Sequence, residues 1–215
     1  MKKLFAVVVA FLGLSFSISS HAQQDAKAKA VLEKMSQKVK SMSSMKADFA
    51  VIATDANGKE ILNQKGTLHM KGEKYNVALP KQELICDGKT MWTYLKDNKE
   101  VQVASYNPDE VQISPKKLFP TSYASEYHYY YAGEKVVKGK KVDIIYLKPK
   151  TTKEFKSVTL LIEKSGMLLS GSVEENGGSY YTFNLNNVQI NGGASDALYS
   201  FDTKKHPGVE VIDLR

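Results

Sequence analysis

The side chains that could carry out chemistry are few in this 215-residue chain, and they are scattered. Three histidines lie beyond the N-terminal segment, at His69, His128 and His206, and none has the flanking residues that place a histidine beside a nucleophile or a metal ion. Glu174 and Glu175 form a carboxylate pair, but they precede a glycine turn, where solvated acids are common. The chain also lacks a phosphate-binding glycine loop and paired cysteine–histidine spacing. We therefore expect no enzymatic activity, no metal site and no cofactor.

The N-terminal segment has the layout of a secretory signal peptide. Two lysines precede an apolar run over 4–14, and positions 20–22 have the small-x-small pattern that signal peptidase cleaves. A transmembrane anchor, the alternative, needs about 20 uninterrupted apolar residues, and serines interrupt this run from Ser15 onward. The sequence predicts an exported protein with a signal peptide at 1–22 and a single domain at 23–215.

Composition limits the partners and the covalent structure. Removing the signal lowers the formal charge from +7 to +5, because that segment holds two lysines and no acids. The remaining excess is spread along the chain, whereas a nucleic-acid backbone needs a concentrated stripe of cations, so we expect no nucleic-acid partner. A diffuse positive surface suits solubility, or contact with anionic membrane surfaces or acidic partners. Cys86 is the only cysteine, so no internal disulfide forms, and its apolar neighbours predict burial.

Hydrophobic periodicity predicts one helix followed by a β-meander. Apolar residues at spacings of three, four and seven, opposite a lysine-rich side, predict an amphipathic helix from Asp25 to Ser43. From residue 46 the period changes to two, and a proline-rich break at 107–125 contains a short helix near 116–119. We expect strands over 46–55, 61–71, 75–79, 84–86, 90–95, 101–103, 127–131, 142–147, 158–163, 168–173, 180–185 and 188–190.

A sheet of about ten short antiparallel strands tends to curl. Its concave apolar face can then be covered by the amphipathic helix or the proline-rich loop, and such sheets often hold a small apolar ligand. Tyrosines crowd the segment 123–131, and Trp92 and Tyr94 share one face of their strand. These aromatic residues fit core packing or the wall of a cavity for acyl chains equally well, because both require the same alternation.

Three motifs resemble one family, the periplasmic outer-membrane lipoprotein carrier proteins (LolA). They are Gly-Thr-Leu-His-Met-Lys at 66–71, Asp-Gly-Lys-Thr-Met-Trp-Thr-Tyr at 87–94, and the closing segment 201–213 with its Pro-Gly-Val-Glu-Val-Ile-Asp. The helix that ends near 42–49 also fits the opening of that family, and the resemblance spans nearly all of the mature chain. The Asp-Gly-Lys-Thr-x-Trp-x-Tyr stretch is its most specific part.

The resemblance implies a mainly β (α+β) fold: an incomplete antiparallel β-barrel whose apolar cavity is covered by the N-terminal helix and short helices. It implies a monomeric periplasmic carrier that takes acylated lipoproteins from an inner-membrane ABC transporter complex to an outer-membrane acceptor. The sequence departs from the family where an arginine followed by proline helps to latch the lid, because these positions are Gly72 and Glu73 here. Either another contact closes the lid, or the cavity is more open.

Alternation and the resemblance together select the candidate cavity residues, although a one-residue shift in register would turn each set outward. Two other functions remain open: a periplasmic lipid- or stress-sensing regulatory domain of the same half-barrel shape, and a structural exported β-protein without a cavity. The candidate residues for binding an apolar ligand are Phe49, Val51, Leu68, Met70, Tyr75, Val77, Trp92, Tyr94, Leu160, Ile162, Tyr181 and Phe183.

Overall fold

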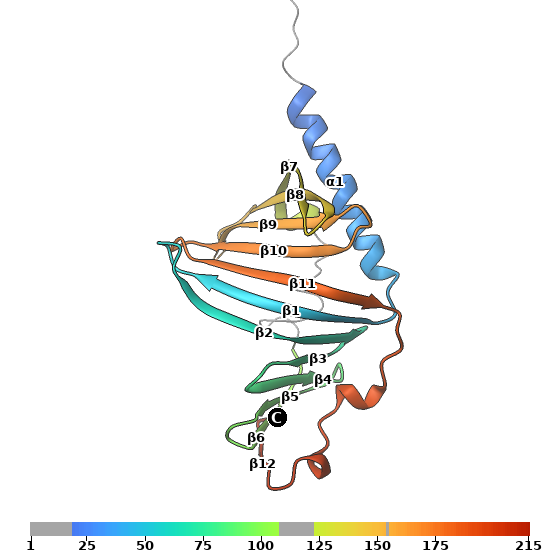
Figure 1. The fold of residues 1–215 in the computed structure, drawn as a ribbon, viewed down its shortest axis with the longest axis vertical. Helices are drawn as coiled ribbons and strands as arrows, with labels where there is room; N and C mark the ends of the chain where they lie inside the picture. The colour runs from blue at the N-terminus through green and yellow to red at the C-terminus, as the bar shows by residue number, and fades with distance from the viewer. Residues whose placement is uncertain (1–18, 108–122, 154) are drawn as a thin grey trace, which may run out of the picture.

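The fold is built on one open sheet of twelve strands (Figure 1). The computed structural model describes residues 19–107, 123–153 and 155–215. The strand order is β12-β6-β5-β4-β3-β2-β1-β11-β10-β9-β8-β7, so that β12 and β7 form the two edges. The strands are β1 (Met45–Thr54), β2 (Glu60–Lys71), β3 (Lys74–Ala78), β4 (Gln82–Cys86), β5 (Thr90–Leu95), β6 (Glu100–Ser105), β7 (Tyr127–Val137), β8 (Lys140–Pro149), β9 (Phe155–Glu163), β10 (Leu168–Glu175), β11 (Tyr180–Ile190) and β12 (Glu210–Asp213).

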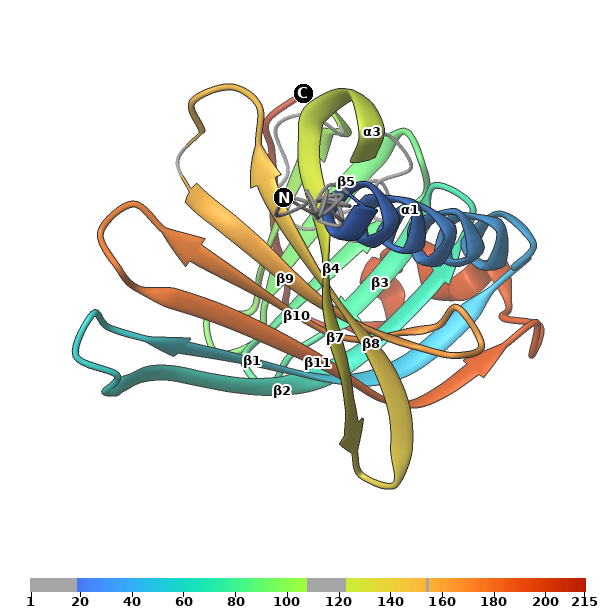
Figure 2. The same cartoon turned by 90° about the horizontal axis from the view of Figure 1, so that it is seen from above.

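The sheet curls around a long helix, α1 (Ser19–Lys40), which lies on its concave side with the short helix α3 (Tyr123–Glu126) (Figure 2). The apolar stripe of α1, which includes Ala28, Leu32 and Met35, is buried in the same cluster as side chains from both halves of the sheet. Because burial of this stripe removes apolar surface from water, it fixes which side of the helix faces the sheet. Within the described residues, no helix has the length and apolar character needed to cross a bilayer.

The predicted fold class is confirmed, and the differences concern the ends of elements, two predicted strands that form one, and the strand β12, which was not predicted. The helix begins earlier than predicted and ends at Lys40, three residues before Ser43. The two strands predicted at 180–185 and 188–190 are one strand, β11, which continues through Asn187 at a φ of 50°. This residue lies in a bulge opposite β1, which explains the break in the sequence pattern. The short helix predicted near 116–119 lies outside the described residues.

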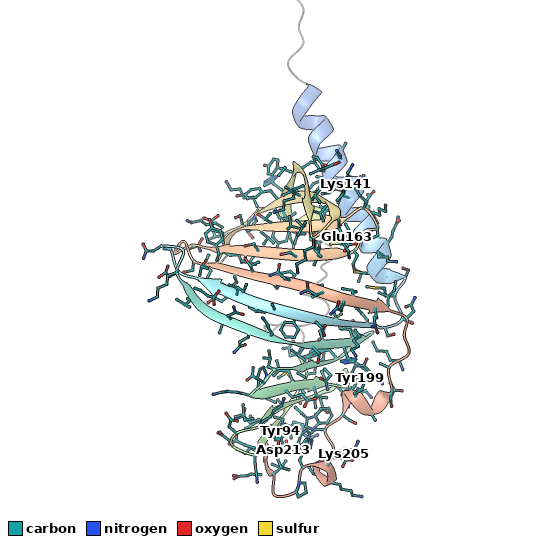
Figure 3. The ribbon with its side chains drawn as sticks, in the orientation of Figure 1. Tyr94, Lys141, Glu163, Tyr199, Lys205 and Asp213 are labelled. Carbon is teal, nitrogen blue, oxygen red and sulfur yellow. The ribbon has the colours of Figure 1, made fainter. Side chains whose placement is uncertain are left out.

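The C-terminal segment covers the outer face of the sheet over β3 to β6. It contains the 3₁₀ helices η1 (Asp196–Tyr199) and η2 (Thr203–Lys205), and it ends in β12, which pairs in parallel with β6. Tyr199 is buried there, and the Asn76 side-chain amide donates to the Leu198 carbonyl oxygen at 2.9 Å (Figure 3). Ile85, Val101 and Val103 are buried on this outer face, so this half of the sheet packs apolar side chains on its outer face as well.

Candidate functional site

The concave face of the sheet carries the largest apolar cluster described. Paired strands place their inward side chains side by side, as in Ala47 beside Leu68 and Met70 beside Tyr75. We call this set the concave cluster. Its buried members are Ala28, Leu32, Met35, Met45, Ala47, Phe49, Leu68, Met70, Tyr75, Val77, Leu79, Cys86, Tyr123, Ile145, Leu147, Leu160, Ile162, Leu168 and Leu185.

Nine of the twelve residues predicted for the cavity lie in or against this cluster. Seven of them are buried members, and the other two, Val51 and Phe183, are half-buried and pack against it. They come from β1, β2, β3, β9 and β11, so that residues far apart in the sequence share one surface. The nine are Phe49, Val51, Leu68, Met70, Tyr75, Val77, Leu160, Ile162 and Phe183.

Trp92 and Tyr94 lie on the opposite face, so their prediction as inward-facing residues was wrong. The inward residues of β5 are Met91 and Thr93, because they pair with Cys86 and Leu84 of the concave side. The larger aromatic residues instead face outward, and the C-terminal segment covers Tyr94 there. The Tyr94 ring centroid lies 5.1 Å from that of Phe201 and 4.7 Å from that of His206.

Tyr181 has the predicted orientation but not the predicted burial. It pairs with Ala53, one step beyond the pairing of Val51 with Phe183, and therefore projects from the same face. The residue is 39% exposed at the open end of its strand and does not belong to the concave cluster. We place it at the margin of the apolar surface.

Several further residues that belong to the concave cluster or pack against it were not selected as candidates from the sequence. Tyr127, Tyr129 and Tyr131 alternate along β7 and pack against the concave cluster, and Tyr123 of α3 is buried within it. The alternation of these tyrosines was visible in the sequence, and their pairing with β8 shows which face they occupy. Cys86 is buried as predicted, and burial raises the pKa of its thiol to about 11.

Two phenylalanine rings on this face lie against glycines of the neighbouring strands. Phe49 pairs with Gly66, and a β-carbon at Gly66 would lie 2.9 Å from Cε1 of that ring. Phe183 pairs with Gly171, and a β-carbon there would collide with the tip of the Phe183 ring. Since a glycine offers no side chain, each ring can cover the backbone of the adjacent strand.

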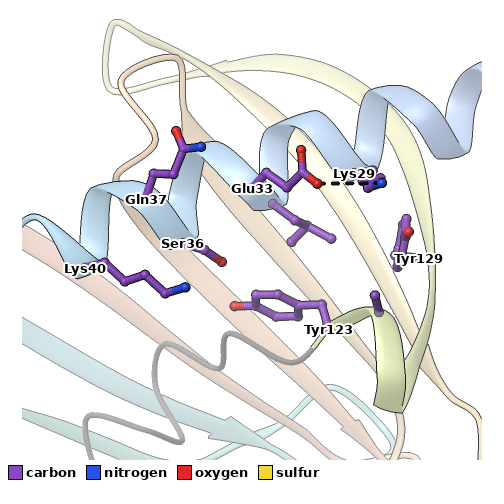
Figure 4. A pocket seen from close by; sticks show the side chains of 9 residues that line it. Lys29, Glu33, Ser36, Gln37, Lys40, Tyr123 and Tyr129 are labelled. Carbon is purple, nitrogen blue, oxygen red and sulfur yellow. Dashed lines mark ion pairs between the residues drawn. The ribbon is translucent and has the colours of Figure 1, made fainter.

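A pocket of about 360 Å³ opens between α1, α3 and β7 at the edge of the concave cluster (Figure 4). Leu32, Tyr123 and Tyr129 supply its apolar wall, and Lys29 and Glu33 form an ion pair of 3.7 Å along α1. This volume is near the lower end of the range for small-molecule sites. The neighbouring apolar surface is occupied by side chains of α1, so a larger ligand would have to displace the helix.

A polar cluster holds α1 against the end of the sheet, and we call it the α1 clasp: Lys27, Tyr131, Glu134, Asp143 and Lys164. The Lys164 ammonium lies 2.6 Å from Asp143 and 2.7 Å from Glu134, and Lys27 of α1 lies 3.4 Å from Glu134. Lys27 also lies 3.9 Å above the Tyr131 ring. A hydrogen bond from Lys164, and to a smaller extent one from Tyr131, lowers the pKa of Glu134 to about 2. The carboxylate is therefore charged at neutral pH.

A second contact joins α1 to the turn between β9 and β10. The Lys34 ammonium donates to the Lys164 carbonyl oxygen. Gly166, at a φ of +86°, allows the helix backbone to approach, because a β-carbon there would lie 3.0 Å from the Lys34 carbonyl oxygen. The helix is therefore held by polar contacts at its rim and by apolar contacts along its stripe.

The comparisons with known proteins agree with this architecture. The family model described as "Outer membrane lipoprotein carrier protein LolA" matches residues 40–202. The chain belongs to the LolA family. It is 30% identical over 176 residues to an outer-membrane lipoprotein carrier protein of Histophilus somni, covering 80% of this chain and 81% of that one. A carrier of the same name from Pasteurella multocida is 27% identical over 207 residues, covering 94% of each chain.

Among solved structures, an uncharacterized conserved protein from Thermus thermophilus shares the LolA-type fold with this chain at a TM-score of 0.59. The sequence identity is 10%, and the match covers 87% of this chain and 99% of that one. At this identity the likeness concerns the fold alone.

The turn that departs from the LolA pattern has a conformation suited to its own residues. Gly72 and Glu73 are exposed and connect β2 to β3, and Gly72 has a φ of +59°. An arginine there would adopt the left-handed region at a cost of about 1–2 kcal/mol. The α1 clasp lies elsewhere, on β7, β8 and the β9–β10 turn, and supplies contacts to the helix from that side.

Proposed function

We propose that this LolA-family protein is a periplasmic, non-catalytic carrier that shields the acyl chains of lipoproteins on its concave face. It takes them from the inner to the outer membrane. The observation that carries the proposal is the concave cluster, a continuous apolar surface inside an open sheet, against which the apolar stripe of α1 packs. The names of the relatives support the type of cargo.

Energetics favours exchange of the helix for the cargo. Lifting α1 exposes Leu32 and Met35, at a cost of about 1.5–3 kcal/mol for each side chain. One acyl chain of about 15 methylenes recovers about 12 kcal/mol when it leaves water, at about 0.8 kcal/mol per methylene. In the periplasm, where the alternative surrounding of the chain is water, burial of a single acyl chain therefore outweighs the exposure of Leu32 and Met35, whereas the unloaded protein keeps its apolar face covered.

The wider scheme includes export and two membranes. Residues 1–22 direct secretion and are removed, which leaves 23–215 as the working domain. The cargo is received from an inner-membrane ABC transporter complex and delivered to an outer-membrane acceptor, with the carrier acting as a monomer. The proposed cargo surface consists of the nine residues that lie in or against the concave cluster, with Tyr181 at its margin.

A release assay tests the carrier function. Residues 23–215 are added to energised inner-membrane vesicles that hold a labelled lipoprotein, and the soluble fraction is analysed for a one-to-one complex. We expect a soluble complex. If no lipoprotein is released while the transporter works with its own carrier, the carrier proposal fails and a sensing function takes its place.

Two neighbouring residues of β1 test the cargo surface with a matched pair of variants. Val51 faces inward beside Phe183, whereas Ile52 faces outward beside Thr182, and both side chains are half-buried. Val51→Asp should abolish the soluble complex because it places a charge on the apolar surface, and Ile52→Asp should preserve it. Both variants are first checked for folding by circular dichroism. Equal release by two folded variants would contradict the assignment of this face.

A further inference from the structure

The tip of the β7–β8 hairpin concentrates positive charge at one end of the molecule. We call residues 135–141 the lysine hairpin, since Lys135, Lys138, Lys140 and Lys141 occupy four of its seven positions and all four are exposed. Its turn is tight, with φ values of 49° at Lys138 and 76° at Gly139, as a two-residue hairpin turn requires. The hairpin extends beyond the neighbouring strands (Figure 2).

The acidic residues near the hairpin do not neutralise its tip. Glu134 and Asp143, at its base, are both bound by Lys164 of the α1 clasp. Glu163 pairs with Lys140 at 2.8 Å. Among the described residues, no carboxylate lies within ion-pair distance of Lys135 or Lys141. The outer part of the hairpin therefore keeps an uncompensated positive charge.

An exposed apolar side chain lies between these lysines. Val136 is 64% exposed, and it pairs across the hairpin with Lys141, so the isopropyl group and the ammonium project from the same face (Figure 3 labels Lys141). An apolar residue in water has no benefit for folding, but beside cations it suits the boundary between lipid headgroups and acyl chains.

A groove next to the lysine hairpin also combines lysine side chains with apolar side chains. Its volume is about 480 Å³, and its lining includes Lys38, Lys138 and Lys140 together with Met167 and Leu169. Glu163, which pairs with Lys140, is the one carboxylate in this lining, so the cations outnumber it. Both apolar residues are buried, whereas Lys138 and Lys140 are exposed. Cations beside an apolar floor match a phosphate headgroup with the first part of its acyl chain.

We propose that the lysine hairpin is a docking surface for anionic phospholipid membranes. An acidic protein partner would require the lysines, but it would not explain the exposed Val136 or the apolar floor of the groove. Each lysine near an anionic surface increases the partition coefficient about fivefold. Lys135, Lys138 and Lys141, which have no ion-pair partner among the described residues, together with one valine therefore give binding that is measurable and reversible. The biological use of this surface rests on the proposed carrier function, whereas the binding itself needs neither cargo nor transporter.

Vesicle co-sedimentation tests this surface. Residues 23–215 are mixed with vesicles of equal parts phosphatidylglycerol and phosphatidylcholine, and with vesicles of phosphatidylcholine alone. We expect binding to the anionic vesicles only, with loss of binding at about 1 M salt, where the Debye length falls to about 3 Å. The double variant Lys135→Gln/Lys141→Gln should reduce the partition coefficient about 30-fold, and Val136→Ser should reduce it several-fold.

The control is a second double variant of the same net charge, Lys59→Gln/Lys65→Gln. Lys59 lies in the turn between β1 and β2 and Lys65 lies within β2. Both are exposed and away from the β7–β8 hairpin, so their loss should leave binding almost unchanged. Equal effects of the two double variants would overturn the proposal, since they would show a response to net charge alone. Absence of binding to anionic vesicles would also overturn it, as would binding that appears only when a membrane protein is added. These outcomes are independent of the release assay, so either proposal can fail alone.

Discussion

Replacement of Gly166 by alanine should loosen α1, and replacement of Gly139 gives a matched control. Both glycines lie in hairpin turns at similar φ values, +86° and +76°. A β-carbon at Gly139 has no atom within 4 Å, whereas one at Gly166 lies 3.0 Å from the Lys34 carbonyl oxygen and 3.2 Å from its carbonyl carbon. The two variants therefore share the backbone strain and differ in the collision with the helix.

The expected magnitudes follow from these two terms. The strain of a left-handed alanine costs about 1–2 kcal/mol in each variant. At Gly166 the helix backbone must also move by a few tenths of an ångström, and a steric insertion of this kind costs about 1–3 kcal/mol more. We expect the free energy of unfolding to fall further for Gly166→Ala than for Gly139→Ala by that second amount.

Denaturant unfolding followed by the fluorescence of Trp92 measures the difference, because this tryptophan lies on the outer face, away from the substitutions. Hydrogen exchange should show faster exchange of the α1 amides in Gly166→Ala only, and binding of a fluorescent fatty acid should increase. Equal destabilisation in both variants, with unchanged exchange in α1, would refute the conclusion that this turn holds the helix.

Three further predictions concern the clasp, the β2–β3 turn and the C-terminal segment. Because the pKa of Glu134 is lowered to about 2 from its ordinary 4.5, the clasp contributes stability that is present above pH 4.5 and is lost as the pH falls toward 2. Glu134→Gln should remove that part of the pH dependence of the unfolding free energy, and an unchanged profile would contradict it. Gly72→Arg should lower stability by about 1–2 kcal/mol at its φ of +59°. A more stable variant would contradict that turn geometry. Phe201→Ala should cost about 1–2 kcal/mol and speed amide exchange in β12. Unchanged amide exchange in β12 would show that the contact of Phe201 with Tyr94 does not hold the C-terminal segment in place.

Alternation was sufficient to place residues where only one face of a strand is apolar. In β2, Leu68 lies between the polar residues Thr67 and His69, so the period of two determines which side chains lie together. In β5 both faces carry apolar side chains, and size then misled the prediction. Tyr94 faces outward, where a segment more than one hundred residues later covers it, and Trp92 shares that face. Local periodicity contains no information on such a contact.

The contacts that hold α1 could not be predicted for a related reason. Lys27, Glu134, Asp143 and Lys164 come from one helix, two strands and one turn, and they meet only through the curl and register of the sheet. Each is an ordinary charged residue in its local sequence. The bulge at Asn187 and the parallel pairing of β12 likewise depend on partners distant in the chain.

The two phenylalanine–glycine pairs of the concave face have a consequence for cargo size. Because the rings of Phe49 and Phe183 take the space that a side chain at Gly66 or Gly171 would fill, the concave surface has room for one side chain at each of these places and not two. A methyl group at Gly171 would collide with the tip of the Phe183 ring and displace it, which changes the shape of the interior without introducing any charge, whereas one at Gly66 would first meet the backbone carbonyl oxygen of Ala78. For the proposed carrier, a single substitution at a glycine of the sheet can thus change the length or number of the acyl chains that fit inside. The α1 clasp is not altered by such a substitution.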